Sequence, residues 1–399
     1  MKFNIWEDYE YMDLPSVLSF IVDNRGKTVP TDENGNHILI ATNCIRNEHL
    51  YPLYEKIRFL NEDTYQTWFR AHPLPGDIIF VNKGTPGRVC LVPDPVDFCI
   101  AQDMMAFRVN SEIVYNKYLL AVLRSEKIQN QINATTVGDV IPHFKKQHLH
   151  EIKIPIPPMS IQKMIGDYYF LFCEKKVLSE KINRNLQQQA HQIFKREFLE
   201  LDEVPNGWKE GSLVDIADYL NGLAMQKFRP KDDEIGLPVL KIKELRQGVC
   251  DASSEQCSPT IKKEYIIHDG DVIFSWSGSL LVDFWCGGDC GLNQHLFKVT
   301  SSQYDKWFYY AWTMHHLERF IAVAADKATT MGHIKREELS KAEVLIPNEA
   351  DYERIGALLE PMYNMIINNR IENRKLASLR DELLPKLMSG EIDVTELDV

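Results

Sequence analysis

The sequence predicts an α+β protein with two duplicated mixed domains, β-rich with helices, and two long helices of the coiled-coil type. The first observation is an internal duplication, in which residues 182–186 match residues 372–376 after 190 positions. The second is a long helical pattern that closes each copy. A period this long exceeds that of solenoid and propeller repeats, which run to tens of residues. It therefore indicates two copies of a whole domain.

The duplicated blocks keep the same order along the chain. Three blocks repeat after 190 positions: 107–109 with 297–299, 143–145 with 333–335, and 156–157 with 346–347. Further upstream, Gly76–Phe80 matches Gly270–Phe274 after 194 positions. We therefore expect the offset to change once, by four residues, between these blocks.

Each copy begins with about 150 residues of short β-like runs separated by Gly, Pro, Asn and Asp, which favour turns. The expected strands are 37–41, 77–81, 98–101 and 106–109 in the first copy, and 237–242, 271–275 and 296–299 in the second. A helical stretch with apolar residues at helical spacing follows in each copy, over 115–132 and 306–325.

The long helical patterns carry an apolar stripe at steps of three, four or seven. The stripe residues are Ile161, Ile165, Tyr168, Leu171, Leu178, Ile182, Leu186, Ala190 and Ile193, then Ile355, Leu359, Met362, Ile366, Leu376, Leu379 and Leu383. A helix of ~38 residues spans about 57 Å, which favours a coiled coil. The alternative is a single amphipathic helix lying on its own domain. We expect the second helix to end near Leu384-Pro385, where proline removes a backbone donor.

Prolines mark the boundaries between these segments. Pro158 and Pro347 precede the long helices, and Pro205-Asn206-Gly207 follows the first. The sequence thus predicts a first domain over 1–158, a central long helix over 159–204, a second domain over 205–347 and a C-terminal long helix over 348–399.

The bulk composition is that of a soluble globular protein, with 44% hydrophobic and 26% charged residues. No window approaches ~18 consecutive apolar residues, and the N-terminal segment lacks an apolar signal core. We therefore expect a cytoplasmic protein. The formal net charge of −12 argues against indiscriminate nucleic-acid binding, which depends on a basic field.

The eight cysteines are scattered, mostly in apolar settings, which favours buried reduced thiols over a disulfide framework. Cys286, Cys290 and His295 form one cluster that could hold zinc. A zinc site needs a fourth ligand and usually a tighter cysteine spacing. A glycine-rich hairpin with two free thiols is therefore the favoured interpretation.

Catalytic motifs are absent from the sequence. No glycine-rich loop precedes Lys-Ser or Lys-Thr, and the glycine before Trp276-Ser277-Gly278 that a nucleophile elbow requires is missing. Neither a base-holding Asn/Asp-Pro-Pro-aromatic tetrad nor a nuclease-like acidic motif occurs. These absences agree with one another and favour a binding function.

Several segments resemble one known family over essentially the whole chain. Residues 154–158 and 161–165, Asn206-Gly207-Trp208, residues 236–243 and 270–274, and residues 379–392 follow in the family's order. They resemble the DNA-specificity subunit of type I restriction–modification systems. The second long helix departs from the pattern, because Pro347-Asn348 replaces the usual double proline and Pro361 interrupts the helix, so this helix is expected to be kinked or to start late.

The resemblance implies two target-recognition domains separated by antiparallel helices. Each domain would read one half of a bipartite double-stranded DNA site, and the helices would set the unread spacer. It also implies docking of two copies of a methyltransferase subunit, which would bring S-adenosylmethionine, and of a motor–endonuclease subunit. The chain itself would be non-catalytic and hold no cofactor or metal.

Bases are read mostly by polar and cationic side chains from loops and element ends. The candidate DNA-binding residues of the first domain are Asn82, Lys83, Thr85, Arg88, Thr135, Thr136, His143, Lys145 and Lys146. Those of the second domain are Ser275, Ser277, Ser279, Lys327, Thr329, Thr330, His333, Lys335 and Arg336. Positions shared by both halves are expected to touch phosphate, and positions that differ are expected to carry base specificity. The alternative for the shared Thr-Thr blocks is a solvated turn before the last strand.

Two other hypotheses follow from the same residues. A coiled-coil adaptor could join two protein ligands without binding DNA. An enzyme could use the Cys286, Cys290 and His295 cluster. A close variant of the main hypothesis is a specificity subunit that serves a single-polypeptide methyltransferase–nuclease.

Overall fold

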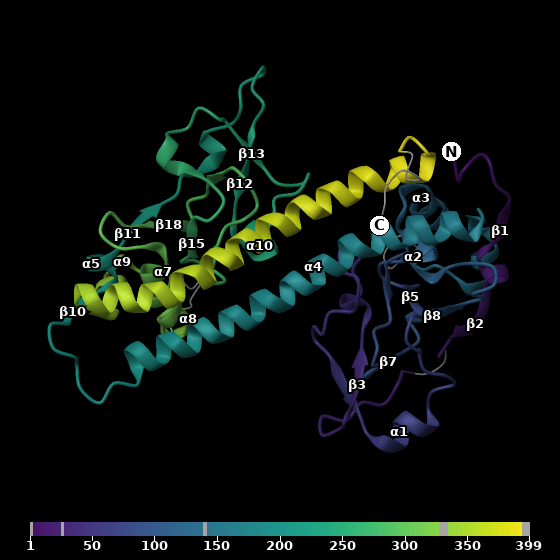
Figure 1. Ribbon diagram of the computed structural model, residues 1–399, viewed down its shortest axis with the longest axis horizontal. Coiled ribbons are helices and arrows are strands. Elements are labelled where there is room, and N and C mark those ends of the chain that lie inside the picture. The colour runs from purple at the N-terminus through teal and green to yellow at the C-terminus, as the bar shows by residue number, and fades with distance from the viewer. Residues whose placement is uncertain (1–2, 25–27, 139–141, 327–333, 393–399) are drawn as a thin grey trace. The chain divides into compact units, whose positions relative to one another are not determined.

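The computed structural model describes residues 3–24, 28–138, 142–326 and 334–392. Two compact units divide the chain: unit 1 comprises residues 1–178 and 376–399, and unit 2 comprises residues 179–375. Each long helix, α4 (Met159–Phe194) or α10 (Glu349–Ser389), therefore contributes residues to both units (Figure 1).

Unit 1 is built on a four-stranded antiparallel sheet and a smaller three-stranded sheet. The large sheet has the order β2 (Leu18–Val22), β8 (Met104–Val109), β5 (Ile78–Val81), β6 (Val89–Leu91). The small sheet has the order β4 (Arg58–Leu60), β3 (His37–Ile40), β7 (Phe98–Ile100), and β1 (Tyr11–Asp13) pairs separately with β9 (Lys153–Pro155). Because β5 is buried along its whole length, its side chains fill a core on each face of the large sheet.

The helices α2 (Asn116–Arg124) and α3 (Glu126–Thr135) and the 3-10 turns η1 (Leu14–Val17) and η3 (Lys146–Glu151) pack in the core on one of these faces. The turn η2 (Thr42–Cys44) packs in the core on the other face, and α1 (Glu62–Thr67) packs against the core of the small sheet. Phe80 and Phe107 of the sheet pack with Tyr118 of α2 and Ile165 of α4 in one core. The single helix expected over 115–132 is two helices, because Ser125 adopts an extended backbone and caps α3.

Unit 2 repeats this topology. Its large sheet has the order β11 (Asp218–Asn221), β18 (Leu296–Thr300), β15 (Val272–Ser275), β16 (Leu281–Phe284). Its small sheet has the order β13 (Gln256–Cys257), β12 (Leu237–Leu240), β17 (Cys290–Leu292), β14 (Ile266–Ile267), and β10 (Lys209–Ser212) pairs with β19 (Glu343–Ile346). The helices are α5 (Leu213–Ile216), α6 (Ile242–Gln247), α7 (Lys306–His315), α8 (Leu317–Asp326) and α9 (Arg336–Ser340), with 3-10 turns η5 (Met225–Lys227) and η6 (Lys263–Tyr265). The predicted duplication is thus confirmed. The expected helix over 306–325 is again two helices, with a break at His316.

The strand registers correct one detail of the predicted repeat. Ile78 lies opposite Phe107 in unit 1, and its counterpart Val272 lies opposite Val299 in unit 2. Phe107 therefore corresponds to Val299, 192 positions later, and not to Phe297. The offset changes in two steps of two residues, because the segment between β15 and β18 is longer by two residues than the match of Phe-Arg-Val with Phe-Lys-Val implies.

A basic side chain reaches the same carboxylate in both units despite this shift. Arg108 donates two hydrogen bonds to Asp77, at 3.0 and 2.9 Å. In unit 2, Lys298 lies 2.8 Å from Asp271, the counterpart of Asp77. Asp77 is 2% exposed, so its charge needs this partner.

The long helices are paired and antiparallel. Within unit 2, Asn369 donates a 2.7 Å hydrogen bond to Asn183, and Arg354 lies 2.9 Å from Glu197 in the π-helical turn η4 (Lys195–Leu199) that extends α4. Residue numbers rise along one helix as they fall along the other. Because α4 and α10 pack on one another, the alternative of a single helix lying on its own domain does not apply.

Two expectations about these helices were wrong. The helix α10 does not end at Pro385 but runs to Ser389, because Leu384 and Met388 are buried in the core of unit 1 and Gly390 ends the helix with a φ of 70°. Leu171 and Leu178, expected in the buried stripe, are 54% and 57% exposed.

The buried face of α4 includes polar side chains that an apolar stripe omits. Gln162 accepts a hydrogen bond from the Tyr115 N–H and donates to the carbonyls of Ile113 and Pro157. Asn183 is also buried and donates to the carbonyl of Ile366. In the middle of α4, the buried face is therefore displaced by about one residue position from the stripe that the apolar residues alone predict.

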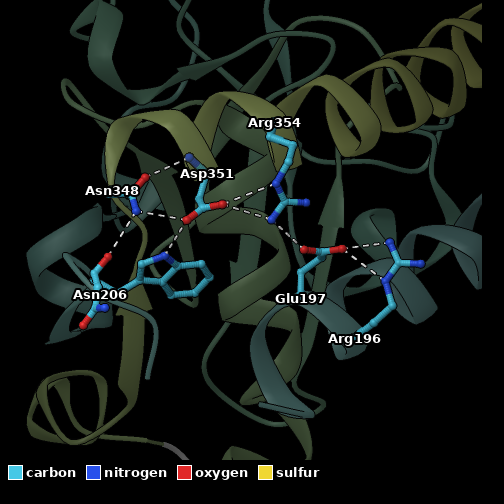
Figure 2. A network of polar contacts seen from close by, with 7 residues as sticks. Arg196, Glu197, Asn206, Asn348, Asp351 and Arg354 are labelled. Atoms are coloured by element: carbon cyan, nitrogen blue, oxygen red, sulfur yellow. Dashed lines mark hydrogen bonds and ion pairs between the residues drawn. The ribbon is translucent and has the colours of Figure 1, made fainter. Parts of the chain in front are cut away.

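The start of α10 shows what replaces the missing second proline. Asn348 caps the helix by accepting a 2.9 Å hydrogen bond from the Asp351 N–H, and its amide donates to the Asn206 carbonyl at 3.3 Å (Figure 2). The Trp208 indole donates to Asp351 at 3.0 Å. This network joins the Asn206-Gly207-Trp208 segment to α10, which begins at Glu349 without delay.

The network also binds the two helices of unit 2 together. Arg354 bridges Asp351 and Glu197, and Arg196 holds the other side of Glu197 (Figure 2). The indole of Trp208, together with Arg354 and Asn348, keeps the pKa of Asp351 below its usual value. The carboxylate is thus ionised at neutral pH and orders both the linker and the helix start.

Candidate nucleic-acid interface

Three candidate segments of unit 1 meet at one end of the large sheet. The hairpin loop after β5 begins with Asn82, whose N–H donates to the Asp103 carbonyl and whose carbonyl accepts from the Phe144 N–H. Lys83 and His143 form an isolated antiparallel bridge, and His143 exchanges two backbone hydrogen bonds with Val137. The structure therefore brings together residues 82–88, 135–137 and 143–146, which are separated by up to 64 positions in the sequence.

The hairpin loop depends on two glycines. Gly84 and Gly87 have φ values of 86° and 88°, where a side chain is strained. The Gly84 N–H donates to the Pro142 carbonyl, which fastens the loop to the segment before His143. Thr85 and Arg88 lie half-exposed in this loop.

The candidate lysines of unit 1 differ in their surroundings. Lys146 lies 3.1 Å from Asp23, and Lys83 lies 3.9 Å from Asp103, with ammonium groups that are close to half exposed. Lys145, directly before Lys146 in the sequence, is exposed to solvent. Two of the three ammonium groups are thus available to phosphate only after they leave a carboxylate.

Both threonine hydroxyls bond within the fold, and the Asn82 side chain is buried. The Thr135 and Thr136 hydroxyls donate to the Ile132 carbonyl at 3.0 and 2.8 Å and so close the end of α3. Asn82 is 2% exposed. Their assignment to DNA contact stays a prediction, and the turn interpretation accounts for both threonine hydroxyls.

The candidate serines of unit 2 shape the hairpin between β15 and β16. Ser275 is buried and donates to the carbonyls of Ser277 and Ser279, at 3.2 and 2.9 Å. Ser277 is buried as well, whereas Ser279 is exposed at the tip. Of these three side chains, only that of Ser279 faces solvent.

The cations of unit 2 lie beside this hairpin. The Ile334 N–H donates to the Trp276 carbonyl at 3.1 Å, as the Phe144 N–H does to Asn82 in unit 1. Lys335 and Arg336 follow at the start of α9 and are exposed. The remaining candidates, Lys327, Thr329, Thr330 and His333, lie outside the described residues.

The same sheet ends hold residues that the sequence analysis did not place among the DNA-binding candidates. They are Asp23 and Asp103 in unit 1, and Asn221, Trp276 and His295 in unit 2. The predicted candidates are cationic residues and polar residues of loops, so carboxylates and residues at strand ends are not among them. The signal that could have found them is their place beside the repeated Gly-Asp-Ile/Val-Ile-Phe strand.

Cys286 and Cys290 lie in different cores and do not form one site. Cys286 packs in the main core of unit 2 with its thiol facing the carbonyls of Phe284 and Ile367, whereas Cys290 belongs to the core of the small sheet. Burial raises the pKa of the Cys286 thiol to about 11, so it is a poor metal ligand at neutral pH. Within the described ranges, no three His, Cys, Asp or Glu side chains are arranged to hold a metal ion. Among the described helices, none combines the length and apolarity needed to cross a membrane.

Comparison with known proteins gives consistent results. A sequence model of the type I restriction modification DNA specificity domain matches residues 7–188 and again residues 205–378. The type I restriction enzyme MjaIX specificity subunit of Methanocaldococcus jannaschii is 25% identical over 346 residues, which cover 81% of this chain and 79% of that protein. The EcoKI specificity subunit of Escherichia coli is 23% identical over 329 residues, which cover 70% of this chain and 66% of that protein.

A solved structure shares the fold. The crystal structure of the type I restriction–modification system S subunit from M. genitalium has a TM-score of 0.59 at 14% sequence identity, and the match covers 97% of this chain and 98% of that one. The domain model matches twice in tandem and spans well over half of the chain, once on each repeat of the topology. The chain therefore belongs to the type I restriction–modification DNA specificity family.

Proposed function

We propose that this chain is the sequence-reading subunit of a type I restriction–modification complex, acting on double-stranded DNA in the cytoplasm. Unit 1 reads one half of a bipartite site and unit 2 reads the other. The observation that carries the proposal is the repeated sheet end, where a hairpin loop, the segment before η3 or α9, and exposed cations meet in the same arrangement twice. DNA recognition needs both kinds of group, because cations neutralise phosphates while polar side chains read base edges.

The chain works with catalytic partners in this proposal. Two copies of a methyltransferase subunit bring S-adenosylmethionine and the methyl-transfer chemistry, and a motor–endonuclease subunit joins for cleavage. The chain itself contributes recognition and holds no cofactor. The helices α4 and α10 set the number of unread base pairs between the half-sites and offer exposed apolar side chains, including Leu171 and Leu178, to the partners.

Co-expression with the methyltransferase subunit encoded beside it, in a host free of DNA methylation, tests this function. Single-molecule sequencing then maps the methylated positions. We expect a split motif, two short specified halves around a fixed gap, that appears only when this chain is present. The same host carrying the methyltransferase subunit alone is the control.

Two outcomes would contradict the proposal. Methylation at the same motif without this chain would show that recognition lies in the partner. A stable complex that methylates no sequence would favour the protein-adaptor hypothesis instead.

A further inference from the structure

Strand register places different side chains at equivalent positions of the two sheet ends. Val22 pairs with Ala106 and Leu220 pairs with Lys298, so Asp23 and Asn221 occupy the same position one residue further on. This inference rests on the proposed function and names the residues that choose the bases.

A second position follows from the neighbouring strand pair. Val81 pairs with Met104, and Ser275 pairs with Leu296. The preceding residues, Asp103 and His295, are therefore equivalent. The turns before them close in the same way, since the Met104 N–H donates to the Ala101 carbonyl and the Leu296 N–H to the Asn293 carbonyl.

Both positions lie at the same sheet end, and in unit 2 they meet at Trp276. In unit 2, the Trp276 indole donates to Asn221 at 3.0 Å, and its ring centroid lies 6.2 Å from that of His295. In unit 1, Asp103 accepts from the Asn82 N–H through its carbonyl, and Asn82 is the counterpart of Trp276.

The backbone around these positions is the same in both units, whereas the side chains at these positions differ in chemistry. In unit 1 the two side chains are carboxylates, and each faces a lysine: Asp23 faces Lys146 and Asp103 faces Lys83. In unit 2 the two side chains are an amide and an imidazole, and Asn221 is exposed. A position that serves only to bind phosphate would not carry a carboxylate, because the two repel one another.

We infer that Asp23 and Asp103 in unit 1, and Asn221 and His295 in unit 2, determine which bases each half-site contains. A carboxylate accepts a hydrogen bond from the cytosine N4 amino group, and an asparagine amide pairs with adenine through N6 and N7. The half-site read by unit 1 therefore contains a cytosine at the position read by Asp103. The half-site read by unit 2 contains an adenine at the position read by Asn221.

The carboxylates of unit 1 have a second effect on binding. Each lysine that pairs with Asp23 or Asp103 must exchange that partner for a phosphate when DNA binds. The correct base supplies a hydrogen-bond donor to the carboxylate at the same moment, whereas a wrong base leaves it facing the duplex unpaired. Discrimination at this position is thus coupled to the release of Lys83 and Lys146.

Exchange of side chains between the equivalent positions tests the inference. The variants are D23N/D103H in unit 1 and N221D/H295D in unit 2, each assembled with the methyltransferase subunit and assayed on a plasmid library with both half-sites randomised. We expect D23N/D103H to change the motif only in the first half, and N221D/H295D only in the second. Methylation of the originally rejected bases should rise about ten- to a hundred-fold relative to the original base.

Matched controls separate specificity from general binding. K145A and K335A remove exposed cations at equivalent places in the two units. They should lower methylation of all sequences without altering the motif. The unchanged half of the motif in each exchange variant also reports that the rest of the complex is folded.

Three results would overturn the inference while leaving the proposed function intact. The exchange variants could methylate the original motif with the original selectivity. They could alter both half-sites together. They could form the full complex and yet methylate no sequence in the library, which would mark these side chains as structural. Failure of the proposed function is distinct, since the unsubstituted chain would then specify no split motif.

Discussion

Lys83 and Lys146, which are predicted to contact DNA, each pair with a carboxylate in this acidic protein. Each ammonium group is close to half exposed and lies near a carboxylate. The Asp103 side chain is 41% exposed, and exposed pairs contribute little stability, so exchange of this carboxylate for a phosphate costs little. The Asp23 side chain is 12% exposed, so its charge depends more strongly on a cationic or hydrogen-bonding partner. The same pairs lower the local positive field in the absence of DNA, which limits binding to unrelated sequences.

His49 gives a prediction at the residue scale. Burial, reinforced by the Lys176 ammonium group, lowers the pKa of His49 to about 4, whereas an unfolded histidine titrates near ~6.5. Between these values the unfolded chain binds more protons than the folded one, so stability falls as pH drops from about 6.5 to 4. Above this window the contribution of His49 is complete.

Replacement of this imidazole should flatten the pH dependence. We expect H49N to lose about 1 kcal/mol less unfolding free energy than the unsubstituted chain between pH 7 and pH 5, after allowance for solvent screening. Urea denaturation at both pH values measures this difference. H191Q, at an exposed position of α4, is the control and should follow the unsubstituted chain. Equal pH slopes for H49N and the unsubstituted chain would refute the assignment.

At the scale of elements, the two long helices approach their domains through equivalent glycines. A Cβ on Gly166 of α4 would lie 2.6 Å from the backbone nitrogen of Tyr118 in α2. A Cβ on Gly356 of α10 would lie 3.1 Å from the Trp307 side chain in α7. The first neighbour is backbone at a distance that real Cβ atoms do not reach, whereas the second is a buried side chain at a longer distance, where a shift of a few tenths of an ångström suffices.

Alanine at these two positions should therefore have different effects. Alanine favours a helix over glycine by about 1 kcal/mol, but overpacking a core costs about 1–3 kcal/mol. We expect G166A to lower the unfolding free energy by about 1–2 kcal/mol, and G356A to leave it within about 1 kcal/mol. Chemical denaturation of the two variants gives the comparison. A G166A variant as stable as G356A would show that α4 can move away from α2.

At the scale of the molecule, two copies of one fold carry different surfaces on the same framework. The hairpin after β5 or β15, the backbone bond from Phe144 or Ile334, and the carboxylate of Asp77 or Asp271 that pairs with a cation recur in both units. Duplication preserves the framework, and the strand ends are free to differ. A site with two unlike halves is the expected result.

The net charge of −12 leads to a prediction for the whole chain. Because an acidic chain creates a poor field for phosphate, the partner subunits should supply many of the phosphate contacts. We expect the isolated chain to bind a duplex with its site at least tenfold more weakly than the assembled methyltransferase does at 150 mM salt. The slope of log affinity against log salt should be shallower for the isolated chain, since each phosphate contact contributes about −0.9.

Fluorescence anisotropy over 50–200 mM salt measures both quantities. The assembled methyltransferase without this chain is the control for nonspecific binding by the partner. Equal affinity and equal slope for the isolated chain and the complex would show that this chain makes the phosphate contacts by itself.

The sequence by itself determined the duplication, the mixed α+β class and the two long helices. These are properties of local pattern: Gly76–Phe80 and Gly270–Phe274 mark the same buried strand, and an uninterrupted helical period needs no tertiary context to be recognised. The sequence also indicated the three segments of unit 1 that meet at the sheet end, because the same short motifs recur in both halves.

Only the tertiary structure decided the strand register, the buried face of α4 and the partners of the candidate residues. A two-residue shift between Phe297 and Val299 depends on how strands pair across the sheet, which short motifs do not encode. Leu171 is exposed and Gln162 is buried because packing and hydrogen bonds, and not hydrophobicity alone, choose the face of a helix. Asp103 became a candidate for base recognition only when folding placed it beside Lys83, 20 positions away in the chain.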